Sequence, residues 1–303
     1  IAERTGRPLE GLEDQLTSMT KRGEIVGVKM GDTRVFAMAP WVVGIYEFQI
    51  DRLDRELCEM FEEYMEVFGP LLTSVQPQIM QSIPIEQEIP SLQEAMPYEQ
   101  VSHIIEQGKS FRVGECICKK EQGILGHPCE KSTEVCLSVM LVEWVEPLRD
   151  WGRSISKEEA YAILKKSEEE GLVHLSGNVE NGQSFFCNCC GCCCGVLRAI
   201  NELNVPNVVN AHFCAEIEED ECNSCGVCLE ERCQVRAIEE VDDTYRVIPE
   251  RCIGCGLCVT DCPTDAIRLF RRADEEIVIP PKDSSEWNDQ RARLRGVDYS
   301  QYR

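Results

Sequence analysis

The sequence predicts an α+β protein in which short helices and hairpins surround regions rich in cysteine. Three observations lead to this fold class. Apolar residues recur at helical spacing around Leu12 and Leu57, a two-residue turn signal at Gly31-Asp32 separates two apolar runs, and 20 cysteines gather at spacings typical of metal ligands. An apolar content of 43% is enough for ordinary cores, and a length of 303 residues suggests two domains or three small ones.

The composition limits the classes of partner and the compartment. A net charge of −23 argues against nucleic-acid binding, which needs Lys and Arg to neutralise phosphates, and favours docking on a basic patch of another protein. The longest apolar candidate, Val35 to Tyr46, contains Pro40 and is too short to span a bilayer. No signal peptide is visible, and ligand-spaced cysteines indicate a reducing compartment, so we expect a cytoplasmic protein.

Residues 1–40 resemble the second half of a winged helix. A helix is predicted to begin at Pro8 and end before Gly23, and a hairpin with its turn at Gly31-Asp32 follows it. The apolar face of this helix consists of Leu9, Leu12, Leu16 and Met19. Glu10 and Glu13 would face phosphates, so a protein-docking use is favoured over a role as an iron–sulfur regulator that binds DNA.

Residues 41–110 are predicted to form a long helix and a connector. An apolar stripe from Trp41 to Phe68 indicates one amphipathic helix, which Gly69-Pro70 would stop. The prolines that follow predict an extended connector over residues 70–97; they are Pro70, Pro77, Pro84, Pro90 and Pro97.

Residues 111–216 form a cysteine-rich domain that closes with Cys214. The candidate cofactor-binding residues are Cys116, Cys118, Cys129, Cys136, Cys187, Cys189, Cys190, Cys192, Cys193 and Cys194. Of these, the candidates for direct metal ligands are Cys116, Cys118, Cys136, Cys187, Cys189 and Cys190. We expect one or two 4Fe-4S clusters here, and two would use eight thiolates and leave three over. Spacing alone does not show which cysteines bind which cluster. A zinc site and a disulfide knot are the alternatives to iron–sulfur clusters here.

Residues 217–272 contain an internal repeat of cysteines. Cys222, Cys225 and Cys228 recur 30 residues later as Cys252, Cys255 and Cys258. Cys233 likewise recurs as Cys262, which precedes Pro263. A triplet spaced by two residues supplies three ligands of one cluster, and the fourth comes from the partner repeat. We therefore expect one 4Fe-4S cluster on Cys222, Cys225, Cys228 and Cys262, and a second on Cys252, Cys255, Cys258 and Cys233.

This repeat resembles the bacterial two-cluster ferredoxins over about one fifth of the chain. The second half fits the pattern fully. The first half departs by one inserted residue before Cys233 and by Gln234 where that family usually has proline, which we interpret as a local loop change. The order of segments along the whole chain is similar to uncharacterised multi-cluster iron–sulfur proteins of anaerobes. Paired zinc sites are the alternative, but zinc ribbons use two cysteine pairs per metal.

Residues 273–303 are predicted to be an extended arm with Trp287 and several arginines as anchors, which would fold on a partner or on the acidic body. The chain as a whole is predicted to be an electron-transfer subunit that docks on a partner oxidoreductase through its acidic surface and this arm. The alternatives are a reductase with a catalytic central site fed by the ferredoxin-like domain, or a regulator. Whether the chain is itself an enzyme stays open, as do its donor and acceptor.

Overall fold

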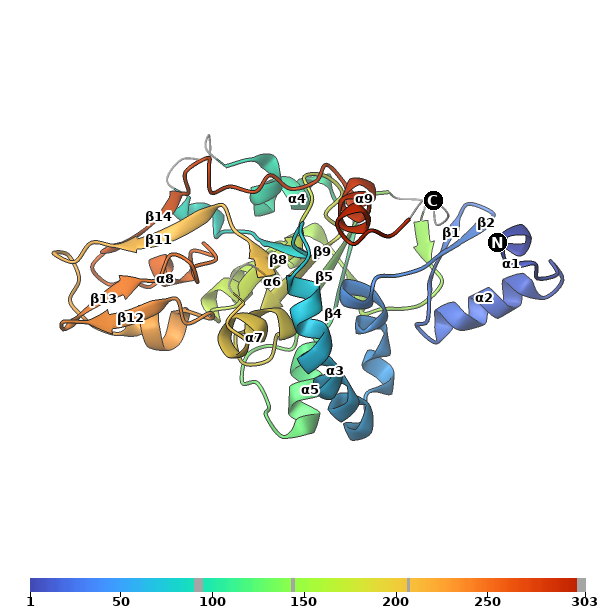
Figure 1. Ribbon diagram of the computed structural model, residues 1–303, viewed down its shortest axis with the longest axis horizontal. Coiled ribbons are helices and arrows are strands. Elements are labelled where there is room, and N and C mark those ends of the chain that lie inside the picture. Colours follow the sequence, from blue (N-terminus) through green and yellow to red (C-terminus); the bar gives the residue numbers. More distant parts are fainter. Residues whose placement is uncertain (90–94, 143–144, 206–207, 299–303) are drawn as a thin grey trace.

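A seven-stranded sheet lies at the centre of the computed structural model, which describes residues 1–89, 95–142, 145–205 and 208–298 (Figure 1). Its strand order is β10 (Val209–Asn210), β3 (Met80–Ser82), β8 (Val173–Gly177), β9 (Phe185–Cys189), β5 (Glu134–Met140), β4 (Ser110–Glu115) and β7 (Arg153–Ile155). Neighbours are antiparallel except β10 and β3. Helix α6 (Lys157–Glu169), whose first turn is capped by the side chain of Ser156, buries Ala160 and Leu164 against this sheet.

The N-terminal segment folds as a helix and a hairpin, but the winged-helix resemblance is not confirmed. A short helix α1 (Ala2–Thr5) precedes α2 (Leu12–Lys21), which begins later than Pro8 and leaves Leu9 82% exposed. Strands β1 (Val26–Met30) and β2 (Thr33–Ala37) pair as predicted, and β6 (Val145–Pro147) from the central region adds a third strand.

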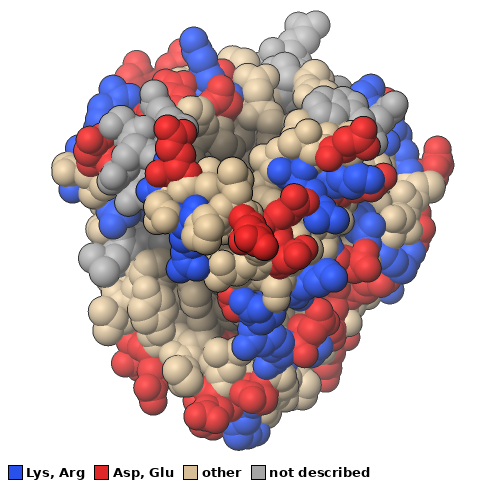
Figure 2. Space-filling model, turned by 90° about the vertical axis from the view of Figure 1, so that its right-hand side faces the viewer, with Lys and Arg blue, Asp and Glu red and all other residues tan. Residues whose placement is uncertain are grey.

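Acidic and basic side chains are interspersed on the face that this N-terminal end of the molecule presents (Figure 2). Three basic residues of this segment have carboxylate partners: Arg22 with Glu24 at 2.6 Å, Arg34 with Glu13 at 2.7 Å and Lys29 with Glu146 at 4.0 Å. These pairs engage half of the six basic residues of this segment, and so reduce the positive charge that a phosphate backbone would require.

The predicted single helix from Trp41 to Phe68 is wrong at both ends. Residues Trp41–Ile45 contain non-helical backbone, Glu47–Arg52 form a 3₁₀ helix, and α3 (Arg55–Thr73) begins where the Asp54 side chain accepts a hydrogen bond from Leu57 N–H at 2.9 Å. A capping aspartate favours a new helix start over continuation. Helix α3 also continues through Pro70.

The connector predicted as extended instead contributes β3 to the central sheet, so segments 41–110 and 111–216 share that sheet. Pro90 lies outside the described residues. Short 3₁₀ turns at Glu86–Glu88 and Pro97–Glu99 precede helix α4 (Val101–Gln107). The connector also meets the C-terminal part of the chain, because Ile85 N–H donates to the carbonyl of Cys255 at 3.0 Å.

The cysteine repeat folds as a small domain at the end of the molecule opposite the N-terminal hairpin (Figure 1). Strand β11 (Phe213–Ile217) pairs with β14 (Ile267–Arg271), and β12 (Ile238–Val241) pairs with β13 (Thr244–Val247). The helical turns Cys228–Arg232 and α8 (Leu257–Thr260) follow the two cysteine triplets.

The C-terminal arm is not wholly extended. It contains α9 (Ser284–Leu294), and its anchors contact the body of the same chain. Trp287 Nε1 donates to the carbonyl of Gln78 at 2.8 Å, and the buried Arg291 donates to the carbonyl of Pro77 at 2.7 Å. No helix in the described part of the chain is long and apolar enough to cross a membrane.

Candidate functional site

The eleven cysteines of residues 111–216 separate in space into groups of six, four and one. The six are Cys116, Cys118, Cys136, Cys187, Cys189 and Cys194, which we name the six-thiol ring. The four are Cys129, Cys190, Cys192 and Cys193, which we name the four-thiol group. The last, Cys214, lies beside Cys252 of the cysteine repeat.

Strand register brings the six-thiol ring together near one end of the neighbouring strands β9, β5 and β4. Because Leu137 of β5 faces Phe186 of β9 in an antiparallel pair, Cys136 and Cys187 face one another in the next position. Cys187 and Cys189 are two residues apart on β9 and so point to the same side. Cys116 follows β4 and is the N-cap of helix α5 (Ile117–Leu125), on which Cys118 lies. Cys194 is the N-cap of α7 (Gly195–Glu202).

The protonation preferences of the ring alternate from one thiol to the next. Hydrogen bonds with neighbouring thiols lower the pKa of Cys116, Cys187 and Cys194, in the case of Cys187 to about 6. The same bonds raise the pKa of the three thiols between them, Cys118, Cys136 and Cys189. Two of the favoured thiolates are helix N-caps, where the helix dipole favours negative charge. The ring is therefore suited to hold positively charged metal.

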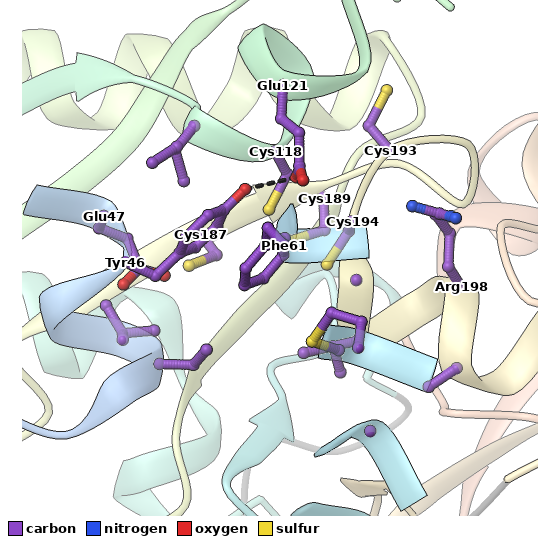
Figure 3. A pocket seen from close by; sticks show the side chains of 18 of the residues that line it. Tyr46, Glu47, Phe61, Cys118, Glu121, Cys187, Cys189, Cys193, Cys194 and Arg198 are labelled. Atoms are coloured by element: carbon purple, nitrogen blue, oxygen red, sulfur yellow. Dashed lines mark hydrogen bonds between the residues drawn. The ribbon is translucent and has the colours of Figure 1, made fainter. Parts of the chain in front are cut away.

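A cavity of about 360 Å³ opens beside the ring, and polar side chains from distant segments line it (Figure 3). Tyr46 donates a hydrogen bond to the carboxylate of Glu121, and Phe61 stacks on Tyr46 at a centroid distance of 3.9 Å. Burial raises the pKa of Glu121 to about 7 and that of Glu47 to about 8. Arg198 also lines the cavity and pairs with Glu62 at 2.7 Å.

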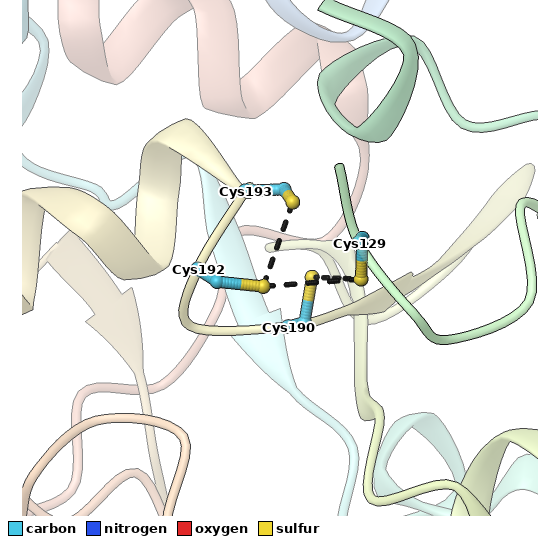
Figure 4. Close-up of side chains that lie close together, drawn as sticks. All are labelled: Cys129, Cys190, Cys192 and Cys193. Carbon is cyan, nitrogen blue, oxygen red and sulfur yellow. Dashed lines mark hydrogen bonds between the residues drawn. The ribbon is translucent and has the colours of Figure 1, made fainter. Parts of the chain in front are cut away.

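The four-thiol group lies next to the ring, where the loop that carries Cys129 meets the turn after β9, and its Cys193 also lines the cavity (Figure 4). The sulfur of Cys129 is 3.7 Å from that of Cys190 and 3.8 Å from that of Cys192, and Cys192 is 3.5 Å from Cys193. Cys190 and Cys193 are buried, whereas Cys192 is exposed.

The cysteine repeat places its eight thiols around two small cavities. Cys222, Cys225, Cys228 and Cys262 line the first, which we name the outer group, together with Tyr245 and Ile267. Cys233, Cys252, Cys255 and Cys258 line the second, the inner group. Each group joins one triplet to the fourth cysteine of the other repeat, which is the crossed arrangement that the sequence predicts.

The inserted residue in the first repeat forms a π-helical turn over Cys228–Arg232. This turn positions the buried Arg232, which donates to the carbonyls of Leu257 at 3.0 Å and of Glu168, at the end of α6, at 2.9 Å. A cation at a helix C-terminus is favoured by the helix dipole. The departure from the ferredoxin pattern therefore attaches the repeat to the central domain.

Gln234, the second departure from the ferredoxin pattern, also attaches the repeat to the rest of the chain. Its side-chain oxygen accepts a hydrogen bond from Gly191 N–H at 2.9 Å, within the turn that carries the four-thiol group. The backbones approach so closely that a Cβ on Gly191 would lie 2.2 Å from the Gln234 carbonyl oxygen. Asn201 donates to that carbonyl oxygen at 3.0 Å. A proline at position 234 would lack the side-chain amide that makes the first of these contacts.

Sequence reasoning missed the polar residues of the cavity, namely Tyr46, Glu47, Glu121 and Arg198. They come from three separate segments, and none lies at a spacing that distinguishes it from surface or core positions. It also left the role of Cys214 open. Hydrogen bonding with Cys214 lowers the pKa of Cys252 to about 6, so this thiol belongs with the inner group.

Comparison with known proteins supports the assignment of the cysteine repeat. Residues 215–269 match the family described as a 4Fe-4S dicluster domain. A ferredoxin of Rickettsia felis is 39% identical over 54 residues, which are 17% of this chain and 49% of that protein. The archaeal-type glutamate synthase (NADPH) of Dehalococcoides mccartyi is 38% identical over 56 residues, which are 18% of this chain and 11% of that protein. The chain thus spans less than half the length of these relatives, and its C-terminal part is a ferredoxin-like domain of the 4Fe-4S dicluster type.

Proposed function

We propose that this chain is an electron-transfer subunit that relays single electrons between a partner oxidoreductase and another carrier. The outer group would hold one 4Fe-4S cluster and the inner group a second. The six-thiol ring would hold a further iron–sulfur centre. When bound, these clusters supply one-electron redox chemistry, and the protein sets their spacing, burial and hydrogen bonding.

The observation that carries this proposal is the packing of the inner group against the ring. Cys233, Cys252 and Cys255 contact the same apolar cluster that contains Cys189 and Cys194 of the ring. Val173 belongs to this cluster and also lines the inner cavity. A continuous apolar contact between two metal-binding groups excludes water and keeps the centres close, which suits electron transfer.

The outer group is placed where a partner could reach it. Asn223, Ser224 and Cys225 are exposed, whereas at the matching positions of the inner group Ile253 and Gly254 are buried and Cys255 is half-buried. The order from solvent inward is therefore outer group, inner group, six-thiol ring. Backbone N–H groups also point at inner sulfurs, from Ala237 to Cys233 at 3.1 Å and from Ala215 to Cys252 at 3.4 Å, which tunes the reduction potential.

Freeze-quench electron paramagnetic resonance tests the relay. The fully reduced chain is mixed anaerobically with oxidised cytochrome c, a basic one-electron acceptor, and the loss of reduced centres is followed. We expect Cys225→Ala to slow the oxidation of the inner and central centres, because their electrons would reach the acceptor through the outer cluster. Cys58→Ala removes a buried thiol outside every group and serves as the control. Unchanged oxidation of the inner centres in Cys225→Ala would contradict the proposed order.

The cavity beside the ring supports a second candidate function, reduction of a small substrate at the central centre. Its volume of about 360 Å³ lies at the lower end of the range for small-molecule sites. It combines the six ring thiols and Cys193 with Glu47, Glu121 and Tyr46, which could position a substrate and exchange protons with it.

Cyanide binding distinguishes this candidate from a pure relay. Cyanide binds an iron that has an open coordination position, so a reductase centre should change its paramagnetic resonance spectrum when cyanide is added to the reduced chain. A relay whose irons are all held by thiolates should show an unchanged spectrum. The Cys58→Ala variant again provides the control.

A further inference from the structure

We propose that Cys129, Cys190, Cys192 and Cys193 form a mononuclear metal site that holds one Zn²⁺ ion in tetrahedral coordination, separate from the redox centres. This inference goes beyond the electron relay and does not depend on it. It rests on the distances between the sulfur atoms, on the contrast with the ferredoxin-like domain, and on the electrostatic surroundings of the site.

The sulfur–sulfur distances match those expected around a single metal ion. Zinc binds cysteine sulfur at about 2.3 Å, so four sulfurs at the corners of a tetrahedron lie about 3.8 Å from one another. The measured distances among these thiols are 3.5, 3.7 and 3.8 Å, and all four sulfurs lie within 4.8 Å of one another. A four-iron cube would place each cysteine on a different iron and so hold the sulfurs farther apart.

The ferredoxin-like domain supplies an internal comparison. Its outer and inner groups also contain four cysteines each, but in neither group do the sulfur atoms all lie within 4.8 Å of one another. Within the described residues, the four-thiol group is the one set of three or more possible metal ligands whose ligand atoms all lie within 4.8 Å. The same chain therefore shows two kinds of four-cysteine arrangement, an open one that matches the 4Fe-4S dicluster family and a closed one that fits a single ion.

A buried lysine stabilises the negative charge that such a site would carry. Four thiolates around Zn²⁺ leave a net charge of −2, because only two of their four charges are neutralised. Lys119 is 3% exposed, and its ammonium group donates to the carbonyl of Ser132. None of the ion pairs found among the described residues gives Lys119 a carboxylate partner. Ser132 lies three residues after Cys129, so the ammonium group of Lys119 is held beside the loop that supplies one of the four ligands.

The site would be structural. A four-coordinate zinc with only protein ligands has no open position for chemistry. Its ligands come from two segments that are far apart in the chain, the loop after α5 and the turn between β9 and α7. A metal ion there would fix that turn, which also supplies Cys189 and Cys194 to the six-thiol ring.

Zinc-edge X-ray absorption of the full chain tests the proposal, because it detects zinc without interference from iron. The chain is produced anaerobically with both metals supplied, and zinc and iron are counted by mass spectrometry. We expect about one zinc ion per chain with four sulfur neighbours at about 2.3 Å. Cys192→Ala and Cys129→Ala should lose most of this zinc, whereas Cys58→Ala should keep it. Cys192 is exposed, so its replacement leaves the core intact.

Two results would overturn the assignment. One is a wild-type chain without zinc in which Cys192→Ala lowers the iron content, since this would place iron at the four-thiol group. The other is zinc whose sulfur neighbours and stoichiometry are the same in Cys192→Ala, Cys129→Ala and wild type. The spectrum of the wild-type protein decides the coordination even if both variants fold poorly.

Discussion

The side-chain oxygen of Gln234 accepts a hydrogen bond from the backbone N–H of Gly191 at 2.9 Å, across 43 positions of sequence. Gln234 stands where the ferredoxin pattern usually has proline, and Gly191 lies in the turn of the four-thiol group. Gln234 and Arg232 lie at the two irregular positions of the first repeat, and both contact the part of the chain that contains the central sheet and α6. The irregularity is therefore part of how a ferredoxin-like unit is built into a larger protein.

Replacing Gln234 by Ala should lower stability by about 1 kcal/mol, because one hydrogen bond is lost and the Gly191 N–H loses its partner. Thermal unfolding of the anaerobic chain measures this, with Gln87→Ala, an exposed glutamine, as the matched control. Arg232→Met should cost more, since several carbonyls lose their donor at once. Equal midpoints for Gln234→Ala and Gln87→Ala would show that this contact contributes nothing measurable.

Replacing Cys258 by Ser should remove one cluster and spare the others. Cys258 belongs to the inner group, whereas the outer group has its own four ligands, so the iron content should fall by about four atoms per chain. Iron and acid-labile sulfide analysis measures the loss, and Cys58→Ser should keep all its iron. Loss of every paramagnetic centre in Cys258→Ser would mean that the groups do not assemble separately.

Glu99 should make stability depend on acid pH. Burial raises its pKa, but hydrogen bonds from His212 and Met96 N–H and the charge of Arg271, 2.9 Å away, outweigh burial, so the pKa of Glu99 is lowered from 4.5. A lowered pKa stabilises the fold above about pH 4.5, and this stabilisation is lost as pH falls through the folded-state pKa. Glu99→Gln should therefore be about 3 kcal/mol less stable at pH 7, with a smaller difference from wild type at pH 4.

Urea unfolding followed by tryptophan fluorescence measures this difference at each pH. Glu10→Gln, at an exposed position, is the matched control and should unfold like wild type. Coincident unfolding curves for Glu99→Gln and wild type at pH 7 would refute the prediction.

Electron transfer to cytochrome c should slow as salt is added. The chain carries a net charge of −23, and the Debye length falls from about 10 Å at 0.1 M to about 3 Å at 1 M, so attraction to a basic acceptor is screened. Stopped-flow rates over this range measure the effect, with a neutral small-molecule oxidant as the control. A rate that does not vary with salt would exclude steering by the acidic surface.

The chain should bind duplex DNA no better than an acidic control protein. Arg22, Lys29 and Arg34 already face carboxylates, so half of the six basic residues in residues 1–40 are engaged, and the net charge of −23 repels phosphate. An anaerobic gel-shift titration at low salt measures binding. Sequence-selective binding in the nanomolar range would favour the regulator over the relay.

Local sequence patterns predicted the ferredoxin-like domain well and the central domain poorly, for a physical reason. The spacing of Cys252, Cys255 and Cys258 fixes three ligands within one turn of chain, and the repeat supplies the fourth. In the central domain, Cys136 meets Cys187 only because β5 and β9 pair in one particular register. Such pairing depends on the whole sheet, so it cannot be predicted from the spacing of cysteines along the chain.

The same limit explains the misplaced helices. The apolar stripe from Trp41 to Phe68 has helical periodicity, but Asp54 caps a new helix within it. Pro70 would ordinarily end a helix, yet α3 continues to Thr73. In the C-terminal arm, Asp283 caps α9 through Ser285 N–H at 2.8 Å, a start signal that the polar composition of the arm concealed.

Two peptide bonds join the six-thiol ring to the four-thiol group, since Cys189 and Cys190 are adjacent in the chain, as are Cys193 and Cys194. The backbone geometry of either group is thus set partly by the other. Loading one with metal holds the neighbouring thiols of the other in place, so binding at each should strengthen binding at the other by the same factor. Maturation of this protein is then cooperative, because whichever metal arrives first prepares the turn for the second.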